Sequence, residues 1–363
     1  MNNDEFVLMK GNEAIAHAAI RCGCDGYFGY PITPQSEVLE TLSLLKPWEE
    51  TGMVVLQAES EVAAINMLYG GGGSGKRVMT SSSSPGIALM QEGLSYMATC
   101  EIPALIVNVQ RGGPGLGTIQ PSQGDYLQAT VGGGNGDYQL IVLAPNSVQE
   151  MADMVETSFE LAFRWRTPVI MLSDGVIGQM MERVKLPEPR ARRSEEEIYK
   201  ECPWATNGSH LRTRKPNILT SLESDPQLMH QRNQALQDKY RRIEQEETRS
   251  ESLDCEDAEY VMVAFGCMSR ICEEVMHELR SQGHKVGLFR PITLWPFPKE
   301  ELRAAARSAK RIMVCELNAG QMIRDVRLAL DCQTECIHYG LMGGLVPDPS
   351  EVLEAANKQL ITP

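Results

Sequence analysis

Long apolar runs, an export signal and an excess of basic charge are all missing from this sequence of 363 residues. No apolar segment approaches the roughly 18 residues that a membrane-spanning helix needs. The first residues, MNNDEFVLMKGNEA, lack the basic-then-apolar pattern of a signal peptide, so we expect a cytoplasmic protein with no membrane partner. The chain carries 48 acidic and 34 basic residues, and its net charge of -14 would repel nucleic-acid phosphates. Nucleic acid is therefore excluded as an expected partner.

Metal-ligand spacings are missing as well. The ten cysteines form no C-x-x-C pair, and the closest neighbours are Cys22/Cys24, Cys267/Cys272 and Cys332/Cys336. Without an export signal, these residues are expected to be reduced thiols that pack as small hydrophobic side chains. We therefore expect no zinc or iron–sulfur ligands, and no metal site, within this chain.

Residues 1–186 alternate strand-like and helix-like segments. The short, β-branched runs are MVVLQ (53–57), RVMTSS (77–82), PALIVNV (103–109), QLIVLAP (139–145) and PVIMLSD (168–174). Helical patterns lie between them at 36–45, 60–70, 86–100 and 147–165. Buried strands that alternate with helices predict an α/β domain with a parallel sheet and helices on both faces.

The rest of the chain divides into a charged connector and a second α/β unit. Residues 187–256 are charged, and a long polar helix begins at Pro226, capped by Ser224 or Asp225. From residue 257 the pattern becomes α/β again. Its strands are expected at 258–266, 284–291 and 311–318, and its helices at 269–283, 299–309 and 321–331. A second, smaller parallel sheet follows from this pattern.

The glycine run YGGGGSGKR (69–77) has the spacing of a phosphate-binding loop, from Gly70 to Gly75 and Lys76. Arg77, however, stands where such a loop has the Ser or Thr that holds magnesium. A phosphate loop also leaves a strand and enters a helix, whereas here a helix comes first and a strand follows. We therefore interpret Gly70–Gly73 as the termination of a helix and a turn.

The segment GYFGYPITPQSE (26–37) leaves a predicted strand and enters a predicted helix. Ligands of open α/β sheets bind beyond the carboxyl ends of the strands, where this segment lies. Pro31 and Pro34 stiffen it, and Thr33 is placed to cap the helix with Pro34 in the first turn. Capping alone would explain Thr33; a hydroxyl pre-organised for a ligand is the alternative.

Two carboxylates, Glu59 and Glu61, occupy the same kind of junction in QAESEVAA (57–64). Both could serve only to satisfy the dipole of the helix that follows. Glu61, however, precedes small apolar residues and could point into a closed apolar interface. A buried carboxyl in such a place can share a proton with a ring nitrogen.

Arg111 ends the strand of NVQRGGPGLGT (108–118) and precedes a glycine-dense loop that indicates close backbone approach or a mobile cover. Its guanidinium suits a carboxylate ligand, although pairing with a surface acid would also explain it. The hydroxyls of TSSSSPG (80–86) are expected to serve turns and caps. SDG (173–175) with Asn207 is similar to the Gly-Asp-Gly…Asn motif of magnesium diphosphate sites, but the first glycine is missing, so we reject that site.

Together these stretches resemble the α-type subunit of thiamine diphosphate-dependent 2-oxoacid:ferredoxin oxidoreductases. The resemblance is carried by GNEAIAHAAIRCGCDGYFGYPITPQSEV, QAESEVAAINMLYGG, IVNVQRGGPGLGTIQPSQGDYL, GLFRPITLWPFP and ELNAGQMIRDVR. The connector segments KPNILTSL and QALQDKYRRIEQEE look most like the branched-chain (3-methyl-2-oxobutanoate, or 2-ketoisovalerate) type. The resemblance implies a pyrimidine-binding thiamine diphosphate fold in 1–186, a connector in 187–256 and a transketolase C-terminal-like domain in 257–363.

The resemblance also implies roles for individual residues. Thr33 would contact the 2-oxoacid and Arg111 would bind its carboxylate. Glu61, rather than Glu59, would bond the aminopyrimidine ring of the cofactor, which acts as the electron sink of the decarboxylation. The residues implied to line the cofactor site beside Glu61 are Tyr30, Pro31 and Ile32.

Two parts that this chemistry requires are missing from the chain: a complete magnesium-diphosphate motif and the cysteine ligands of an iron–sulfur cluster. The resemblance therefore implies an incomplete half-site. A β-type subunit would supply magnesium, the diphosphate cradle and at least one cluster, and γ- or δ-type subunits are further candidate partners. The implied reaction converts a branched-chain 2-oxoacid and coenzyme A to acyl-CoA, carbon dioxide and reduced ferredoxin.

Three alternatives share parts of this pattern. The same chemistry could act on 2-oxoglutarate or pyruvate. The β-type subunit of a lipoyl-dependent 2-oxoacid dehydrogenase has the same domain order, but YPITP and QRGGP speak against it. A non-catalytic scaffold subunit would tolerate Glu61→Ala, whereas an enzyme subunit would lose turnover with its assembly preserved.

Overall fold

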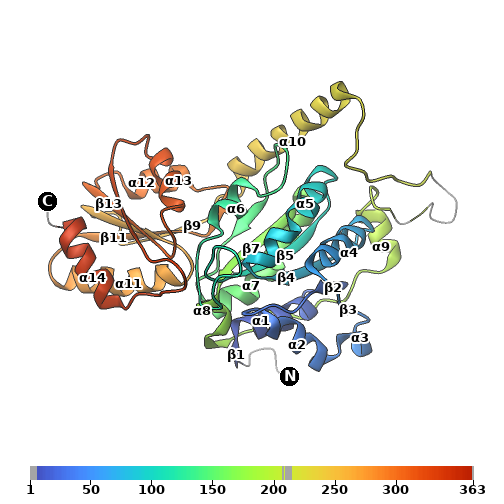
Figure 1. The fold of residues 1–363 in the computed structure, drawn as a ribbon, viewed down its shortest axis with the longest axis horizontal. Helices are drawn as coiled ribbons and strands as arrows, with labels where there is room; N and C mark the ends of the chain where they lie inside the picture. The colour runs from blue at the N-terminus through green and yellow to red at the C-terminus, as the bar shows by residue number, and fades with distance from the viewer. Residues whose placement is uncertain (1–5, 207, 209–214, 362–363) are drawn as a thin grey trace.

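The computed structural model describes residues 6–206, 208 and 215–361, so Asn207 of the rejected magnesium motif lies outside the described residues. Within these ranges the strands form sheets of seven, five and two strands. The two larger sheets lie side by side along the long axis of the molecule, and the smaller one belongs to the orange and red part of Figure 1. The predicted α/β class with two largely parallel sheets is confirmed by the strand pairing.

The larger sheet has the strand order β12-β6-β7-β5-β4-β2-β3. Its strands are β2 (Gly26–Gly29), β3 (Val54–Gln57), β4 (Val78–Ser82), β5 (Ala104–Gln110), β6 (Ile141–Leu143), β7 (Pro168–Asp174) and β12 (Thr293–Trp295). All pairs are parallel except the one between β12 and β6. Strand β12 comes from the segment predicted for the second domain, so the sequence pattern did not predict this edge.

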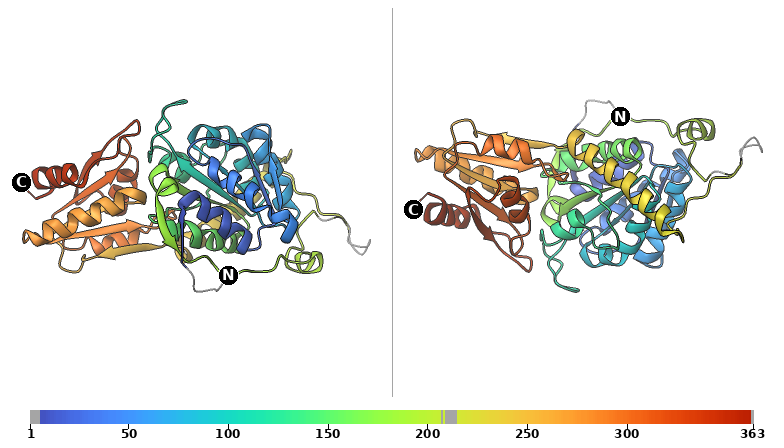
Figure 2. Two further views of the ribbon diagram at one scale, coloured as in Figure 1. Left: turned by 90° about the horizontal axis from the view of Figure 1, so that it is seen from below. Right: turned by 90° about the horizontal axis from the view of Figure 1, so that it is seen from above.

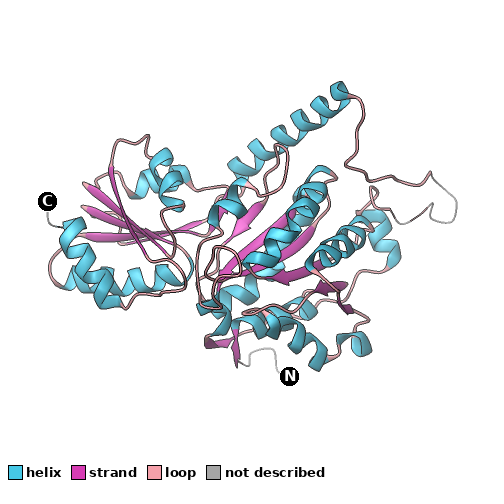
Figure 3. Cartoon of the chain, in the orientation of Figure 1, coloured by secondary structure: helices cyan, strands magenta, loops and turns pink. Residues whose placement is uncertain are grey.

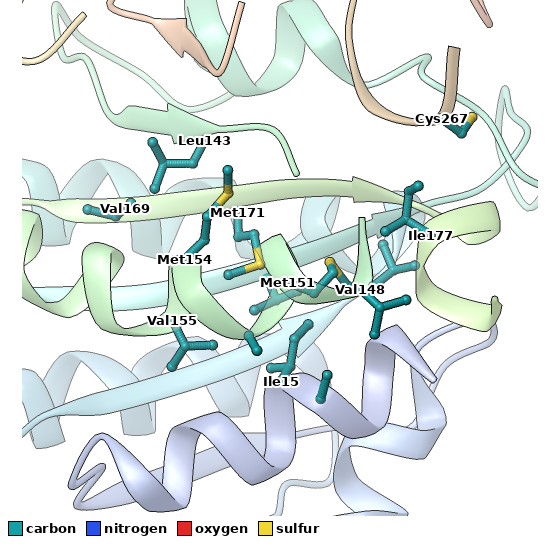
Figure 4. Close-up of a cluster of buried hydrophobic side chains, with 14 of the residues drawn as sticks. Ile15, Leu143, Val148, Met151, Met154, Val155, Val169, Met171, Ile177 and Cys267 are labelled. Carbon is teal, nitrogen blue, oxygen red and sulfur yellow. The ribbon is translucent and has the colours of Figure 1, made fainter. Parts of the chain in front are cut away.

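Helices cover both faces of the larger sheet, as the sequence predicts. They are α1 (Gly11–Arg21), α2 (Ser36–Leu45), α3 (Pro47–Glu50), α4 (Glu61–Gly73), α5 (Ser84–Thr99), α6 (Tyr126–Val131), α7 (Val148–Trp165) and α8 (Gly175–Gln179). Figure 4 shows part of the core, where Met151 of α7 lies between Met171 of the sheet and Ile15 of α1. Apolar side chains at helical spacing on α7 therefore place that helix on the sheet.

The glycine run at Gly70–Gly73 lies inside α4, which ends with Ser74 as its C-cap. The helix therefore ends at this run, as predicted, but the prediction of a turn at Gly70–Gly73 is wrong, because these four residues are its last helical residues. Backbone with positive φ comes only afterwards, at Gly75 (φ 82°). The order of elements is as predicted, because α4 precedes β4, and this order differs from that of a phosphate-binding loop.

Gly72→Ala should lower the free energy of unfolding by about 1–3 kcal/mol, because the core there has no room for a methyl group. An added Cβ would lie 2.6 Å from Ile102 Cγ2 and 2.8 Å from the carbonyl oxygen of Pro103. Gly70 is the matched control in the same helix, since its Cβ would meet nothing within 4 Å. Gly70→Ala should stabilise by about 0.5–1 kcal/mol through helix propensity. Denaturant unfolding checks both; equal effects would contradict close packing as the reason for Gly72.

The connector begins with β8 (Met181–Val184), which pairs antiparallel with β1 (Val7–Lys10), and continues through α9 (Glu195–Glu201) to α10 (Pro226–Glu246). The predicted cap of the long polar helix is confirmed: Asp225 accepts a hydrogen bond from Gln227 N at 2.8 Å. Helix α10 runs across the first domain towards the second (Figure 2). Of the described helices, none combines the length and apolar composition needed to cross a membrane.

The smaller sheet, drawn in magenta at the left of Figure 3, has the strand order β14-β13-β10-β11-β9. Its strands are β9 (Ser250–Leu253), β10 (Tyr260–Ala264), β11 (Val286–Pro291), β13 (Arg311–Glu316) and β14 (Glu335–Gly340). The helices around it are α11 (Gly266–Ser281), α12 (Lys299–Ala305), α13 (Met322–Ala329) and α14 (Pro349–Ala355), followed by the π-helix η1 (Ala356–Ile361). The three predicted strands and three predicted helices are all present; β9, β14 and α14 are additional, and β9 lies within the segment predicted as connector.

Candidate active site

The predicted site residues follow neighbouring strands of the larger sheet. Tyr30–Pro34 follow β2, Glu61 begins α4 just after β3, and Arg111 comes directly after β5. Strands β5, β4, β2 and β3 are adjacent and parallel, so their carboxyl ends meet at one edge of the sheet. The fold therefore brings Thr33, Glu61 and Arg111 to the same edge.

Glu61 is buried, with 7% of its surface exposed, whereas Glu59 is exposed. Ser60 caps α4, and its hydroxyl also contacts the Glu59 carboxylate at 3.1 Å. The Glu61 side chain lies against α5, because a Cβ added at Gly86 would stand 2.7 Å from Glu61 Oε1. Glycine at position 86 therefore leaves the space that the carboxylate occupies.

The YPITP loop does not use Thr33 as a helix cap, so that prediction is wrong. Helix α2 has Gln35 at its N-cap position without a side-chain cap bond. The Gln35 backbone N–H donates to Ile32 O (3.0 Å) and its side-chain amide to Tyr30 O (3.1 Å), so the turn closes before the helix begins. Thr33 is exposed, Tyr30 and Ile32 are half-buried, and Pro31 is exposed.

The end of this loop is held by α1 and α8. Asn12 Nδ2 and Gln179 Nε2 donate to the Pro34 carbonyl at 2.7 and 2.9 Å. Both amides also donate to Glu37, which forms an ion pair with Lys10. Burial alone would raise the pKa of Glu37, but the hydrogen bonds from Gln179 and Asn12 outweigh it and the pKa is lowered. A charged Glu37 therefore keeps both amides in place.

Arg111 is 9% exposed and has no ion-pair partner in the described part of the chain. Its Nη1 donates to Thr33 O at 3.0 Å and its Nη2 to Leu116 O at 3.1 Å, while its buried Nε has no partner. The alternative that Arg111 pairs with a surface carboxylate is therefore not supported, because no such carboxylate contacts it among the described residues. A buried guanidinium without a counter-charge is costly, so the arrangement suits an anionic ligand.

The glycines after Arg111 allow close backbone contact, one of the two roles that the sequence indicated. A Cβ added at Gly112 would lie 2.8 Å from the backbone carbon of Gly343, in the loop after β14. Gly117 has a φ of 54°, and a Cβ there would collide with the Gly112 carbonyl oxygen. The loop thus folds on itself and touches the second domain.

The hydroxyls of the TSSSS segment were expected to serve turns and caps, and most do not. Ser81 Oγ contacts the Tyr27 hydroxyl (2.8 Å) and donates to Gln35 Oε1 (2.5 Å) beneath the YPITP loop. The side chain of Ser83 makes no cap bond, although it stands at the N-cap position of α5. Within the described residues, the buried side-chain oxygens without a partner here belong to Thr80, Ser82 and Ser83. The Ser82 hydroxyl lies beside Glu61, since a Cβ added at Gly86 would meet both side chains, and unpaired buried hydroxyls here indicate a polar ligand.

Asp174, from the rejected magnesium motif, is committed to the protein interior. Its Oδ1 accepts from the N–H groups of Val176 and Ile177, at 3.0 and 3.1 Å, and its Oδ2 from Cys267 N at 2.9 Å. The side chain therefore caps α8 and holds the start of α11. Among the described residues, no cluster of three His, Cys, Asp or Glu side chains could hold a metal ion.

Two known families match this chain, one over the segment that forms most of the larger sheet and one over the segment that forms most of the smaller five-stranded sheet. Residues 17–249 match the family "pyruvate flavodoxin/ferredoxin oxidoreductase, thiamine diP-binding". Residues 258–352 match "pyruvate:ferredoxin oxidoreductase core domain II". The chain belongs to the pyruvate flavodoxin/ferredoxin oxidoreductase family. The resemblance stated from the motifs is thereby confirmed, and the chain is a subunit of a thiamine diphosphate-dependent 2-oxoacid:ferredoxin oxidoreductase.

Relatives within the oxidoreductase family cover nearly the whole chain. The ketoisovalerate oxidoreductase subunit VorB of Methanothermobacter thermautotrophicus is 46% identical over 348 residues, which are 96% of each chain. A 2-oxoglutarate:ferredoxin oxidoreductase from Magnetococcus marinus, solved with 2-oxoglutarate, coenzyme A and succinyl-CoA bound, has a TM-score of 0.85 at 28% identity. That match covers 98% of this chain but only 65% of the Magnetococcus chain. A split-gene transketolase (TM-score 0.60, 14% identity) shares the fold alone.

The second domain of this oxidoreductase subunit reaches the site through an interdomain strap, residues 121–127. Gln123 in the strap is fully buried. Its side chain donates to Phe265 O (2.8 Å) and accepts from Leu317 N (3.1 Å), while Asn318 Nδ2 donates to Gln123 O (2.8 Å). Phe265 and Leu317 follow β10 and β13 directly, so the carboxyl ends of the smaller sheet hold the strap.

One polar residue near the site of this family member was missed from the sequence. Asp125, in the strap, accepts from Asn108 Nδ2 at 2.9 Å, and the Ser84 hydroxyl lies near its carboxyl group. Burial raises the pKa of Asp125, and the contacts with Ser84 and Asn108 act against this rise. In the sequence, Asp125 is marked only by its position after the glycine loop, in PSQGDY. That position does not indicate a contact with residues of β5 and α5.

Proposed function

We propose that the chain is the α-type subunit of an enzyme that oxidatively decarboxylates a branched-chain 2-oxoacid. With coenzyme A, the products would be acyl-CoA, carbon dioxide and reduced ferredoxin. The observation that carries this proposal is the buried Arg111, whose guanidinium faces no acid among the described residues and contacts the Thr33 carbonyl at 3.0 Å. A 2-oxoacid carboxylate is the anion that such a fork-shaped donor suits.

Thiamine diphosphate, when bound, supplies the electron sink for the loss of carbon dioxide. The residues present fit its aminopyrimidine side: Glu61 offers a buried carboxyl, and Ser82 and Ser83 offer unpaired buried hydroxyls. Glu61 would exchange a proton with a ring nitrogen, and Arg111 and Thr33 would orient the substrate. The further residues proposed to line the cofactor site are Tyr30, Pro31 and Ile32.

The branched-chain substrate is proposed from similarity and from the surroundings of Arg111. The VorB relative is named for ketoisovalerate. The side chains of Leu116 and Ile119 extend from the same loop, and both are exposed apolar groups. An alkyl substrate suits such neighbours better than 2-oxoglutarate, whose second carboxylate would need another cation.

We further propose that partner subunits complete the site in the cytoplasm. The proposed domains are 1–186 and 257–363, with 187–256 as the connector between them. A β-type subunit would bring magnesium, the diphosphate cradle and iron–sulfur clusters. Further partners would be γ- or δ-type subunits, ferredoxin and coenzyme A. Exposed apolar side chains beside the site support a docked subunit. They are Val54 and Leu56 of the edge strand β3, Val62 of α4 and Leu89 of α5.

The test is ferredoxin reduction by the chain purified together with the products of neighbouring genes. With coenzyme A present, 2-ketoisovalerate should give a kcat/KM at least about tenfold above 2-oxoglutarate and pyruvate, as one or two extra apolar contacts provide. Omitting coenzyme A or ferredoxin provides the controls. A preference for 2-oxoglutarate would reject the branched-chain assignment alone. Activity only with NAD and a lipoyl carrier would reject the ferredoxin-dependent reaction.

A further inference from the structure

Asp125 precedes α6 at its N-cap position but does not cap it, since no side-chain cap bond is present. Its carboxylate turns instead towards the end of β5 and the start of α5, where Asn108 Nδ2 donates to it at 2.9 Å and the Ser84 hydroxyl lies near it. Its backbone N–H donates to Gln110 Oε1 at 3.0 Å. Asp125 is therefore fixed by three residues that belong to the edge of the sheet where the site lies.

Ser84 in turn contacts the backbone of Arg111. Its hydroxyl accepts from Arg111 N at 3.1 Å and lies 3.2 Å from Arg111 O. The Asp125 carboxyl group lies near the same hydroxyl, so its removal would leave Ser84 without one of its polar neighbours. The position of Ser84, and with it that of the Arg111 backbone, is therefore expected to depend on Asp125.

The other side of Asp125 is anchored to the second domain. The next residue, Tyr126, is fully buried, and its hydroxyl donates to Asp325 Oδ2 of α13 at 2.6 Å. Gln321 donates to the carbonyl of Gly124 at 2.7 Å. The residues on either side of Asp125 are therefore held by α13 and the turn before it.

We propose that Asp125 is a positioning residue that, through Ser84, holds Arg111 in the geometry that binds the substrate carboxylate, with the interdomain strap as its support. This inference rests on the proposed function, because it takes Arg111 as the residue that binds the substrate carboxylate. It gives the second domain a part in that recognition. Asp125 acts through other residues and is not proposed to touch the substrate.

The test compares a carboxylate inhibitor with its neutral counterpart in the assembled holoenzyme. Isovalerate and isovaleramide are measured by calorimetric titration and by competition with 2-ketoisovalerate. Asp125→Ala should weaken isovalerate binding about tenfold, the usual cost of unpairing a buried hydrogen bond, and leave isovaleramide unchanged. KM for the 2-oxoacid should rise with a smaller change in kcat. Asp125→Asn should retain most of the affinity, since its amide and a flipped Asn108 amide, whose Oδ1 is unpaired, can rebuild the contacts.

Two further variants make the result decisive. Ser84→Ala should reproduce the selective loss of isovalerate binding even if Asp125→Ala does not fold. Asp137→Ala is the control at an exposed aspartate and should change the affinity for neither ligand. Equal weakening of both ligands by Asp125→Ala and Ser84→Ala, or no weakening, would overturn the inference. A wild-type complex that binds isovalerate selectively but reduces no ferredoxin with any 2-oxoacid would instead refute the proposed function.

Discussion

Glu61→Gln should lower kcat for ferredoxin reduction by about 10²–10⁴-fold, the usual contribution of a group that transfers a proton in the reaction. The replacement keeps the volume of the buried side chain and its contact with Gly86, so the chain should still fold and assemble. What it removes is the carboxyl group that can exchange a proton with the cofactor ring. The measurement is kcat of the purified complex, with size-exclusion chromatography to establish assembly.

Glu59→Gln is the matched control for this substitution. Glu59 lies two residues away on the same junction but is exposed, so its loss should leave kcat within about twofold of wild type, as for most surface changes. Unchanged turnover in Glu61→Gln would favour the scaffold alternative. Loss of assembly in the same variant would show that Glu61 has a structural role instead.

Arg111→Ala should raise KM for the 2-oxoacid about 100-fold with a smaller change in kcat, because charge-assisted hydrogen bonds to the substrate carboxylate are lost. Arg111→Lys should recover only part of the affinity, since an ammonium group cannot offer the paired donors of a guanidinium. Steady-state kinetics over a range of 2-oxoacid concentrations measures both effects.

The control for Arg111 is Arg241, an exposed residue of α10 that forms a surface ion pair with Asp238. Arg241→Ala should leave both KM and kcat unchanged, because an exposed ion pair contributes little. An unaltered KM in Arg111→Ala would remove this residue from the substrate site and with it the main structural support for a carboxylate ligand.

Much of the fold can be read from local patterns. Helix α2 and strand β7 have the predicted bounds, 36–45 and 168–174. Their signals are strong, because apolar residues recur at helical spacing in the first and form an unbroken buried run in the second. The cap at Asp225 was equally accessible, since aspartate followed by proline favours a helix start.

What could not be predicted depends on contacts between distant segments. The glycines near position 72 look like a turn, but they remain helical and Gly72 packs on Ile102, a contact that local sequence cannot indicate. Strand β14 has half-buried and polar residues, so no apolar run announces it. In the site, the carboxyl edge of the sheet was predictable because each site residue follows a predicted strand, whereas the exposure of Thr33 and the bonds of Asp125 follow from tertiary packing.

The pairing of β12 with β6 has a practical consequence for anyone who divides the gene. A fragment ending at residue 256 would lack Thr293–Trp295. Strand β6 would then be the edge strand of the sheet, with unpaired backbone amide and carbonyl groups. Tyr240 of α10 would also lose the ring of Trp295, which it meets edge-on at 5.8 Å. Such a fragment would offer a template for self-association, so successful expression of this half alone would require the short return strand to be grafted onto it.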